Sequence, residues 1–491
     1  MIRRFRHHID HLLDDSGFRG PVLKLLSGTG YAFVLAYIAK TVLLRIYDPG
    51  DFGIYAAVFA IVSILTPLVT LRYEDALMIS DTPRRSAHAF ILSMGVLLVM
   101  STLLLVMIPF RHDIEALFGE PAMADWIWTV PFVLLIQRGA KNMELWLTRS
   151  EQFGSVSMGQ VVQSTTMTGV RIGLGFWRSS PGGLIYGFAA GHFLQAVLYA
   201  RRLRTSLVQA LSNENPGESG VDRSVIVWLM RRYRKFPMFT TPAAIISAGV
   251  SQMPALLLLY YFDKEVLGIY SQAFAVLFIP MSQLGMIISQ VFFVRAVEAN
   301  RSGTLAALSG NVHRRMVMMA WIPTGILMVA GGDIFSVLFG EPWRASGDFI
   351  LYLGPWILLT TVASPLTRLF DVLERQRYEL VIAVVMFLSL TGALILGGRT
   401  GSVEITMLLL GIGGAIVRAS QLVLLLRLAG FRLLSALMPY IRYIAVSAPL
   451  LTLLYFVEHL YTSWATLGAA ILVAGLFGLY VLYSEQLLHR R

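Results

Sequence analysis

Fourteen stretches of mostly apolar residues follow one another along this chain, and they constrain its fold more than any other feature. A helix needs about 20 such residues to cross the hydrocarbon core of a bilayer. The chain is 56% hydrophobic and only 14% charged, which leaves too few charges to cover a soluble surface. The sequence therefore predicts an all-α polytopic membrane protein with about 14 transmembrane helices. The expected spans are residues 22–44, 52–77, 88–110, 125–147, 155–177, 182–203, 238–262, 266–294, 316–332, 348–370, 378–397, 403–426, 437–457 and 462–484.

The basic residues between these spans predict the orientation. With the N-terminus in the cytoplasm, 25 lysines and arginines fall on the inner side, counting Arg201 and Arg202 at the end of the sixth span, and 6 fall in outer loops. An excess of basic residues is typical of cytoplasmic loops. We therefore expect a multi-pass membrane protein with both termini in the cytoplasm. The same bias explains the net charge of +11 without a nucleic-acid partner.

Two pairs of matching segments indicate an internal duplication. Residues 53–60 (GIYAAVFA) match residues 268–275 (GIYSQAFA), and Asp113–Pro121 resembles Asp333–Pro342 with one insertion. Both pairs occupy the same place in a six-helix unit, and units six spans apart point the same way through the membrane, as in parallel-repeat transporters. We expect two six-helix lobes related by a parallel pseudo-two-fold repeat, followed by two C-terminal helices.

This duplication predicts where the parts of the chain begin and end. The expected parts are a cytoplasmic amphipathic N-terminus at 1–21, an N-lobe at 22–203, a cytoplasmic linker with an amphipathic helix at 204–237, a C-lobe at 238–428, and the last two spans with a short cytoplasmic tail at 429–491. In the linker, Val225, Trp228 and Leu229 alternate with arginines in a pattern typical of a helix lying on an anionic leaflet.

Ionisable side chains within the spans carry the functional signal. A charged group near the bilayer centre costs about 2.5–3.5 kcal/mol on insertion scales, so it usually faces protein or a hydrated cavity. Arg138 and Arg171 stand out because neither has an acidic residue one helical turn away. The candidates for a substrate cavity are Arg138, Arg171, Lys141, Lys40 and Arg72, with Arg368 and Arg418 in the C-lobe. The candidates for coupling or gating are Glu144, Glu74, Asp75 and His192.

Several of these residues also have a structural interpretation. The alternatives are local ion pairs for Arg72–Asp75 and Lys141–Glu144, snorkelling of Arg368 and Arg418 to the inner interface, and simple packing of His192. The excess of midspan cations over midspan acids nevertheless favours an anionic substrate group such as a phosphate or pyrophosphate. We find no P-loop, no metalloprotease or hydrolase motif and no cysteine, so we expect a transporter, not an enzyme, with no cofactor and no bound metal.

The segment Tyr47–Tyr55 (YDPGDFGIY), followed by Leu71–Glu74 (LRYE), resembles the opening of bacterial polysaccharide (O-antigen, Wzx-type) flippases. These belong to the multidrug/oligosaccharidyl-lipid/polysaccharide exporter superfamily. The resemblance implies flipping of a polyprenyl-pyrophosphate-linked oligosaccharide to the periplasmic leaflet, by alternating access, for O-antigen, capsule or exopolysaccharide. It also implies membrane lipids, a polysaccharide polymerase and glycosyltransferases as partners.

Three other functions remain open at this point. Fourteen spans also suit flippases of lipid-linked peptidoglycan precursors. An ion-coupled multidrug exporter of the same fold would be expected to carry midspan carboxylates. A membrane polysaccharide polymerase fits less well, because the outer loops of this chain are short.

The charge bias generates a test of topology. A reporter that is active only in the periplasm, fused after Arg491, should be inactive, and a reporter active only in the cytoplasm should be active there. Fusions within the loop around Arg178 serve as the matched control and should give the opposite result. Periplasmic activity of the fusion after Arg491 would contradict the even number of spans.

Overall fold

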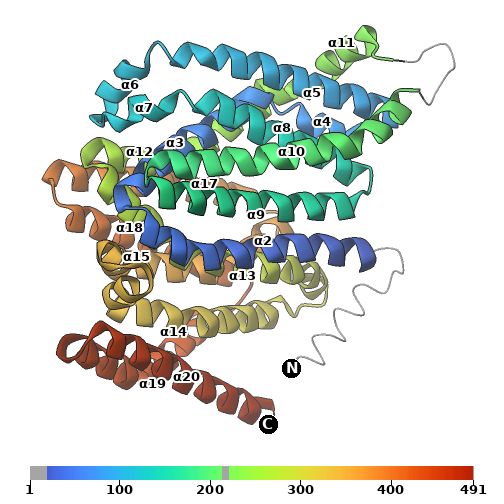
Figure 1. Ribbon diagram of the computed structural model, residues 1–491. Helices are drawn as coiled ribbons and strands as arrows, with labels where there is room; N and C mark the ends of the chain where they lie inside the picture. The colour runs from blue at the N-terminus through green and yellow to red at the C-terminus, as the bar shows by residue number, and fades with distance from the viewer. Residues whose placement is uncertain (1–18, 213–219, 490–491) are drawn as a thin grey trace. The chain divides into compact units, whose positions relative to one another are not determined.

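The computed structural model describes residues 19–212 and 220–489, and for residues 19–27, 29 and 485–489 it describes the backbone alone. The first 18 residues of the expected amphipathic N-terminus lie outside the described residues. All regular structure within the described ranges is helical, with no strand. This confirms the predicted all-α polytopic fold. The chain divides into two compact units, Met1–Met253 and Pro254–Arg491 (Figure 1).

The first unit (blue to green in Figure 1) holds six long helices joined by short ones. Its helices are α2 (Arg19–Ile46), α3 (Pro49–Thr70), α4 (Glu74–Ile79), α5 (Pro83–Leu103), the 3₁₀ helix η1 (Leu104–Met107), α6 (Arg111–Phe118), α7 (Ala122–Ile127), α8 (Val130–Arg149), α9 (Phe153–Trp177), α10 (Pro181–Ser212), α11 (Arg223–Arg232) and the π-helix η2 (Phe236–Thr240).

Helix α12 (Thr241–Tyr261) contains the boundary between the two units, which falls at Pro254. The second unit continues with α13 (Lys264–Arg301), α14 (Leu305–Phe339), η3 (Glu341–Trp343), α15 (Arg344–Ala363), η4 (Ser364–Arg368), α16 (Leu369–Val372), α17 (Gln376–Thr400), α18 (Val403–Leu428), α19 (Leu433–Leu460) and α20 (Ser463–His489). The expected linker at 204–237 ends 16 residues before this boundary.

Eleven of the described helical segments are long and apolar enough to cross a membrane. Three further helices, α2, α8 and α9, coincide with expected spans and are 28, 20 and 25 residues long. The span expected at 125–147 begins later than predicted. A turn at Trp128–Thr129 interrupts the helix and separates α7 from α8. Helix α8 is the most polar of these long helices, since it carries Gln137, Arg138, Lys141, Asn142 and Glu144.

Within the first unit, α2 and α9 lie side by side and run in the same direction (Figure 1). Gly28 lies against Ser157 near one end of the pair, and Gly175 lies against Ile46 and Tyr47 near the other. Small residues at such contacts let two backbones approach closely, which is how membrane helices gain packing energy. The parallel direction is what the first and fifth spans of an alternating bundle require.

Several helix contacts recur in both units. In the first unit α3 contacts α5 and α8, α5 contacts α8, and α10 contacts both α8 and α9. In the second unit α13 contacts α14 and α15, α14 contacts α15, and α18 contacts both α15 and α17. The close packing of α2 against α9 is not repeated between α12 and α17, so the two units agree in part of their packing. The symmetry that relates the two units stays a prediction.

Helix α11 packs against the protein with part of its apolar face. Leu229 is fully buried and Val225 packs against the same core on α5 and α10, whereas Trp228 stays 41% exposed. The Arg85 guanidinium lies 4.8 Å from the centre of the Trp228 ring. We expected all three apolar residues to face the leaflet. Two of them instead pack on protein, because α5 offers an apolar surface that the sequence pattern of α11 could not reveal.

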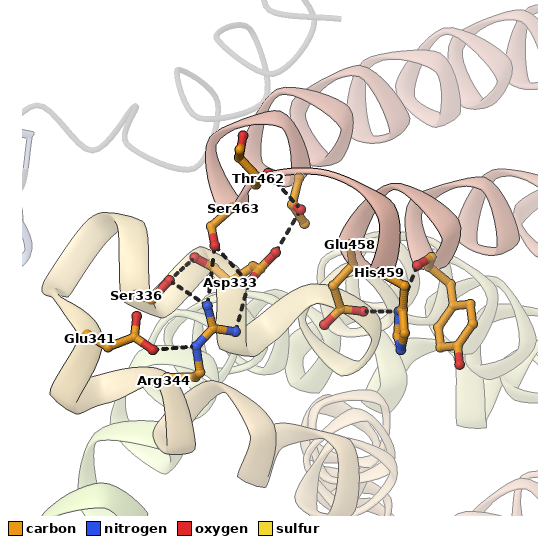
Figure 2. A network of polar contacts seen from close by, with 10 residues as sticks. Asp333, Ser336, Glu341, Arg344, Glu458, His459, Thr462 and Ser463 are labelled. Carbon is orange, nitrogen blue, oxygen red and sulfur yellow. Dashed lines mark hydrogen bonds and ion pairs between the residues drawn. The ribbon is translucent and has the colours of Figure 1, made fainter.

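A buried carboxylate joins the C-terminal helix α20 to α14 (Figure 2). Asp333 on α14 pairs with Arg344 on α15 at 2.7 Å and accepts hydrogen bonds from the hydroxyls of Ser463 at 2.9 Å and Thr466 at 2.7 Å on α20. Arg344 also pairs with Glu341 at 2.8 Å. A side chain that is only 6% exposed is stable as a charge only with such a complete set of partners.

The matching segment of the first unit folds differently. Asp113 lies on the short helix α6 and is exposed, whereas Asp333 lies within the long helix α14 and is buried. In the described part of the first unit, no helix contacts Asp113 in the way that α20 contacts Asp333. The two matching segments therefore place their aspartates in different surroundings.

We predict that Asp333→Asn lowers the stability of the protein, because it removes the charge that Arg344 and two hydroxyls share. The expected loss is about 1–3 kcal/mol, measured as a lower Tm of the purified protein in detergent. Asp113→Asn is the matched control and should leave Tm unchanged. Equal effects of the two substitutions would contradict the role of Asp333.

Candidate functional site

A cavity lined entirely by polar side chains lies within the first unit, between α8, α9 and α10. Its volume is about 260 Å³. The residues that line it are Gln137, Arg138, Lys141, Glu144, Gln160, Gln163, His192 and Gln195. Apart from the neighbours Gln137 and Arg138, successive lining residues on each helix are three positions apart, which places them on one face. Three polar stripes on helices that pack together thus enclose one polar space.

Arg138, one of the residues that line this cavity, forms an ion pair with Glu74 on α4. The Arg138 guanidinium Nη2 lies 2.8 Å from Glu74 Oε1, and the two side chains are 16% and 3% exposed. Glu74 Oε1 also accepts a hydrogen bond from the Thr70 hydroxyl at 3.0 Å, while Glu74 Oε2 and Arg138 Nε are buried without a partner among the described residues. The pair therefore retains one free acceptor and one free donor.

This pair corrects one expectation. Arg138 has no acidic partner one turn away on its own helix, but it has one 64 residues earlier in the chain. Glu74 lies just beyond the end of α3 and is nevertheless buried at 2% exposure. The reason is the turn after α3, where Leu71 and Arg72 take positive φ values of 47° and 58° and direct α4 back against α8. Two consecutive left-handed residues that are not glycine store backbone strain, which is common at functional sites.

The remaining charged residues of the cavity are paired locally. Lys141 Nζ lies 2.6 Å from Glu144 Oε1 on the same helix. Arg72 and Asp75 form the other local pair at 3.0 Å, with both side chains 36% exposed, and they do not line the cavity. In the absence of a ligand, the charges of Glu74, Arg138, Lys141 and Glu144 balance one another.

His192 begins a chain of hydrogen bonds that leads away from the cavity. Its Nδ1 lies 3.1 Å from Gln195 Oε1, the Gln195 amide donates to the Tyr199 hydroxyl at 3.2 Å, and that hydroxyl donates to the carbonyl of Val156 at 3.0 Å. Gln195 and Tyr199 are buried. The chain fixes the orientation of the His192 ring and connects α10 to α9.

Arg171 lies outside the cavity, two turns beyond Gln163 on α9. Its guanidinium donates to the Tyr55 hydroxyl at 2.6 Å and to the carbonyl of Leu184 at 3.1 Å, and it lies 5.0 Å from the centre of the Tyr55 ring. Arg171 thus holds α3, α9 and α10 together without any carboxylate. Lys40 on α2 also lies outside the cavity and forms no hydrogen bond or ion pair with the described residues.

The two cations expected in the second unit have local partners. Arg368 pairs with Asp371 at 3.3 Å and donates to the Ser289 hydroxyl at 3.4 Å. Arg418 donates to Gln421 Oε1 at 2.6 Å.

Four residues that line the cavity are not among the candidates predicted from the sequence: Gln137, Gln160, Gln163 and Gln195. Gln195 lies one turn after His192, and that spacing is the signal that could have found it. Gln137 has no such signal because it is adjacent to Arg138 and reaches the cavity from the side of the stripe. The ion pair between Glu74 and Arg138 carries no sequence signal either.

The sequence profile of a family described as "Polysaccharide biosynthesis protein" matches residues 42–348, which include every residue of this cavity. The chain belongs to this polysaccharide biosynthesis protein family. No curated protein matches the sequence significantly. The family places the chain among membrane proteins of polysaccharide synthesis.

Solved structures show the same fold in transporters. A structure titled "Lipid II flippase MurJ, inward closed conformation" covers 95% of this polysaccharide biosynthesis protein and 100% of its own chain, with 12% identity and a TM-score of 0.70. The match to an inward-facing multidrug resistance MATE family transporter of the MOP superfamily covers 83% of this chain and 98% of the transporter chain, with 11% identity and a TM-score of 0.57. Family and fold together confirm the resemblance to polysaccharide flippases of that superfamily.

We predict strong energetic coupling between Glu74 and Arg138. Arg138→Gln should lower stability by about 3–5 kcal/mol, because it leaves a buried carboxylate without its partner. The double variant Glu74→Gln/Arg138→Gln should recover most of that loss. The measurement is a double-mutant cycle from unfolding of the purified protein in detergent. The half-exposed pair Arg72–Asp75 is the control, with an expected coupling of about 0–1 kcal/mol, and equal coupling in both cycles would contradict the prediction.

Proposed function

We propose that this protein flips a polyprenyl-pyrophosphate-linked oligosaccharide from the cytoplasmic to the periplasmic leaflet by alternating access, in the synthesis of O-antigen, capsule or exopolysaccharide. The observation that carries the proposal is the wholly polar cavity within a helical bundle of a polysaccharide biosynthesis protein. Such a substrate has a polar head that cannot cross hydrocarbon unaided, because each unsatisfied polar group there costs several kcal/mol.

The cavity lining matches the two kinds of group that the substrate carries. Four glutamine amides both donate and accept hydrogen bonds, as sugar hydroxyls do. Arg138 and Lys141 offer cations to a phosphate. A volume of about 260 Å³ equals that of roughly nine water molecules at ~30 Å³ each, so the cavity accommodates one part of the head group at a time.

Arg138 is the residue that we propose to bind the pyrophosphate. A guanidinium remains charged when buried and can hold a phosphate through two parallel hydrogen bonds. In the absence of substrate, this guanidinium forms an ion pair with the Glu74 carboxylate. Exchange of one anion for another lets Arg138 bind the phosphate without ever becoming an unpaired charge, and the freed Glu74 carboxylate then becomes the group that couples substrate binding to a cation or proton.

The other residues have supporting tasks in this proposal. Lys141 and Glu144 form a second pair that a ligand can separate, and His192 accepts or donates a proton at the cavity wall. Asp75 keeps Arg72 beside the strained turn. Arg171, Lys40, Arg368 and Arg418 lie outside the cavity, and we assign them no contact with substrate in this conformation. The proposal places the protein in the inner membrane with both termini in the cytoplasm, next to a polymerase and glycosyltransferases, and requires no cofactor.

A flippase for a lipid-linked peptidoglycan precursor is the second candidate. The fold likeness to the structure titled as a lipid II flippase favours it. Both substrates carry a pyrophosphate and sugars on a polyprenyl chain, so the same cavity chemistry serves both. Rescue of a strain that lacks its peptidoglycan precursor flippase, without rescue of a strain that lacks its polysaccharide flippase, would favour this candidate.

We predict that Arg138→Ala abolishes export and also lowers the amount of protein in the membrane, because Glu74 is left unpaired. The double variant Glu74→Gln/Arg138→Ala removes that unpaired charge, so it should be abundant and still inactive. Arg138→Lys should retain partial export, since lysine keeps the positive charge but cannot bind a phosphate through two parallel hydrogen bonds. The measurement is surface polysaccharide and membrane abundance in a flippase-deficient strain.

The matched control for this experiment is Arg178→Ala, which removes an exposed arginine of the same unit and should export normally. Full export by the double variant at normal abundance would refute the role of Arg138.

A further inference from the structure

A second cavity lies in the other unit, between the first turns of α14 and those of α19. Its volume is about 480 Å³. Its polar lining comes from Asn311, His313, Arg314, Ser435 and Arg442, and no carboxylate lines it. Two guanidinium groups and no acid distinguish this cavity from that of the first unit, where every cation has an acidic partner.

Neither arginine of this cavity is neutralised elsewhere. Arg314 forms no hydrogen bond or ion pair with the described residues, and its Nε atom is buried without a partner. Arg442 donates from Nε to the Tyr480 hydroxyl at 2.6 Å and lies 5.5 Å from the centre of that ring. A tyrosine orients a guanidinium without cancelling its charge, so the terminal nitrogens of Arg442 keep their capacity for an anion.

The walls of the cavity are fixed by contacts across the two helices. The His313 ring nitrogen Nε2 lies 3.1 Å from the carbonyl oxygen of Ala436 and donates to it. Gly310 lacks a side chain at the point where the Phe431 ring packs against α14. The two guanidiniums are therefore presented by a preformed framework and need little ordering when a ligand binds.

The surface beside the cavity is strongly apolar. Along the same turns of α19, Leu434 is 85% exposed and Met438 is 65% exposed, and Leu437 and Ile441 are exposed as well. Since α14 begins at Leu305 and α19 at Leu433, the cavity lies near one end of both spanning helices. That is the depth at which lipid head groups meet hydrocarbon. A cationic cavity next to an apolar helix face fits a ligand with an anionic head and a hydrocarbon tail.

We propose that this cavity binds the phosphate of an anionic bilayer phospholipid, with Arg314 and Arg442 on the phosphate and the acyl chains along the exposed face of α19. Asn311 and Ser435 donate further hydrogen bonds to the head group. The lipid fastens α19 to α14 at the end opposite to Asp333, where no ion pair among the described residues does so. This site is independent of the cavity in the first unit.

The test uses the purified full-length protein in a neutral detergent. Dioctanoyl phosphatidylglycerol is titrated while Tm is measured, since a ligand that binds only the folded state raises Tm with concentration. Parallel titrations use dioctanoyl phosphatidylcholine, inorganic phosphate and a short polyprenyl phosphate. We expect a saturable rise in Tm with phosphatidylglycerol, and a much smaller rise with phosphatidylcholine or inorganic phosphate.

Three variants identify the site. Arg314→Gln/Arg442→Gln should weaken the apparent affinity for phosphatidylglycerol about tenfold or more, because two charge-assisted contacts are lost. Arg314→Lys/Arg442→Lys keeps the charge and should retain binding within a few-fold, and it tests the site even if the glutamine variant fails to fold. Arg399→Gln, an exposed arginine at the far end of α17, should bind like the unmodified protein.

Four results would overturn the proposal. These are equal stabilisation by inorganic phosphate, equal stabilisation by phosphatidylcholine, stabilisation by polyprenyl phosphate alone, or unchanged affinity in the glutamine variant. The export assay is not involved, so failure of this proposal leaves the proposed flippase function untouched, and the reverse also holds.

Discussion

A charged side chain within the hydrocarbon of a bilayer needs an opposite charge, a set of hydrogen bonds or a hydrated space, and most of this structure follows from that requirement. Arg138 satisfies it through Glu74, and Asp333 satisfies it through Arg344 and two hydroxyls. Arg171 satisfies it without any acid, through Tyr55 and a main-chain carbonyl. In each case the polar contacts join neighbouring helices and fix their register. The hydrophobic effect alone would not do so, because lipid tails are as apolar as the helix surfaces.

The same requirement separates the two cavities. In the first unit the charges balance in the absence of ligand, so the substrate of the proposed function has to displace an existing partner, and the proposal links its binding to the release of Glu74. Such a device suits a transporter, which must release what it binds. In the second unit Arg314 and Arg442 have no acid to displace, and a ligand held there has no competitor. That arrangement suits a lipid that stays bound.

Local polar contacts were predictable and distant ones were not. The pairs Lys141–Glu144 and Arg72–Asp75 join residues three apart on the chain, and the helical repeat alone places them together. Glu74 and Arg138 lie 64 residues apart, and their contact depends on the left-handed turn at Leu71–Arg72. The sequence does not predict this turn, because neither residue is a glycine. The polar stripe on α8 was evident from spacing, but its enclosure by α9 and α10 required the packing of three helices.

The sequence by itself determined the all-α polytopic membrane fold and the presence of cations within the spanning segments, because hydrocarbon thickness and the cost of charge act on each segment separately. The matching segments also predict two similar halves, and several but not all helix contacts recur in both units. Only the tertiary structure decided which charges meet. Asp113 and Asp333 occupy matching positions, yet only Asp333 is buried, because α20 brings Ser463 and Thr466 to it. The environment of a side chain comes from neighbours far away in the chain, and the pattern around a residue contains no record of them.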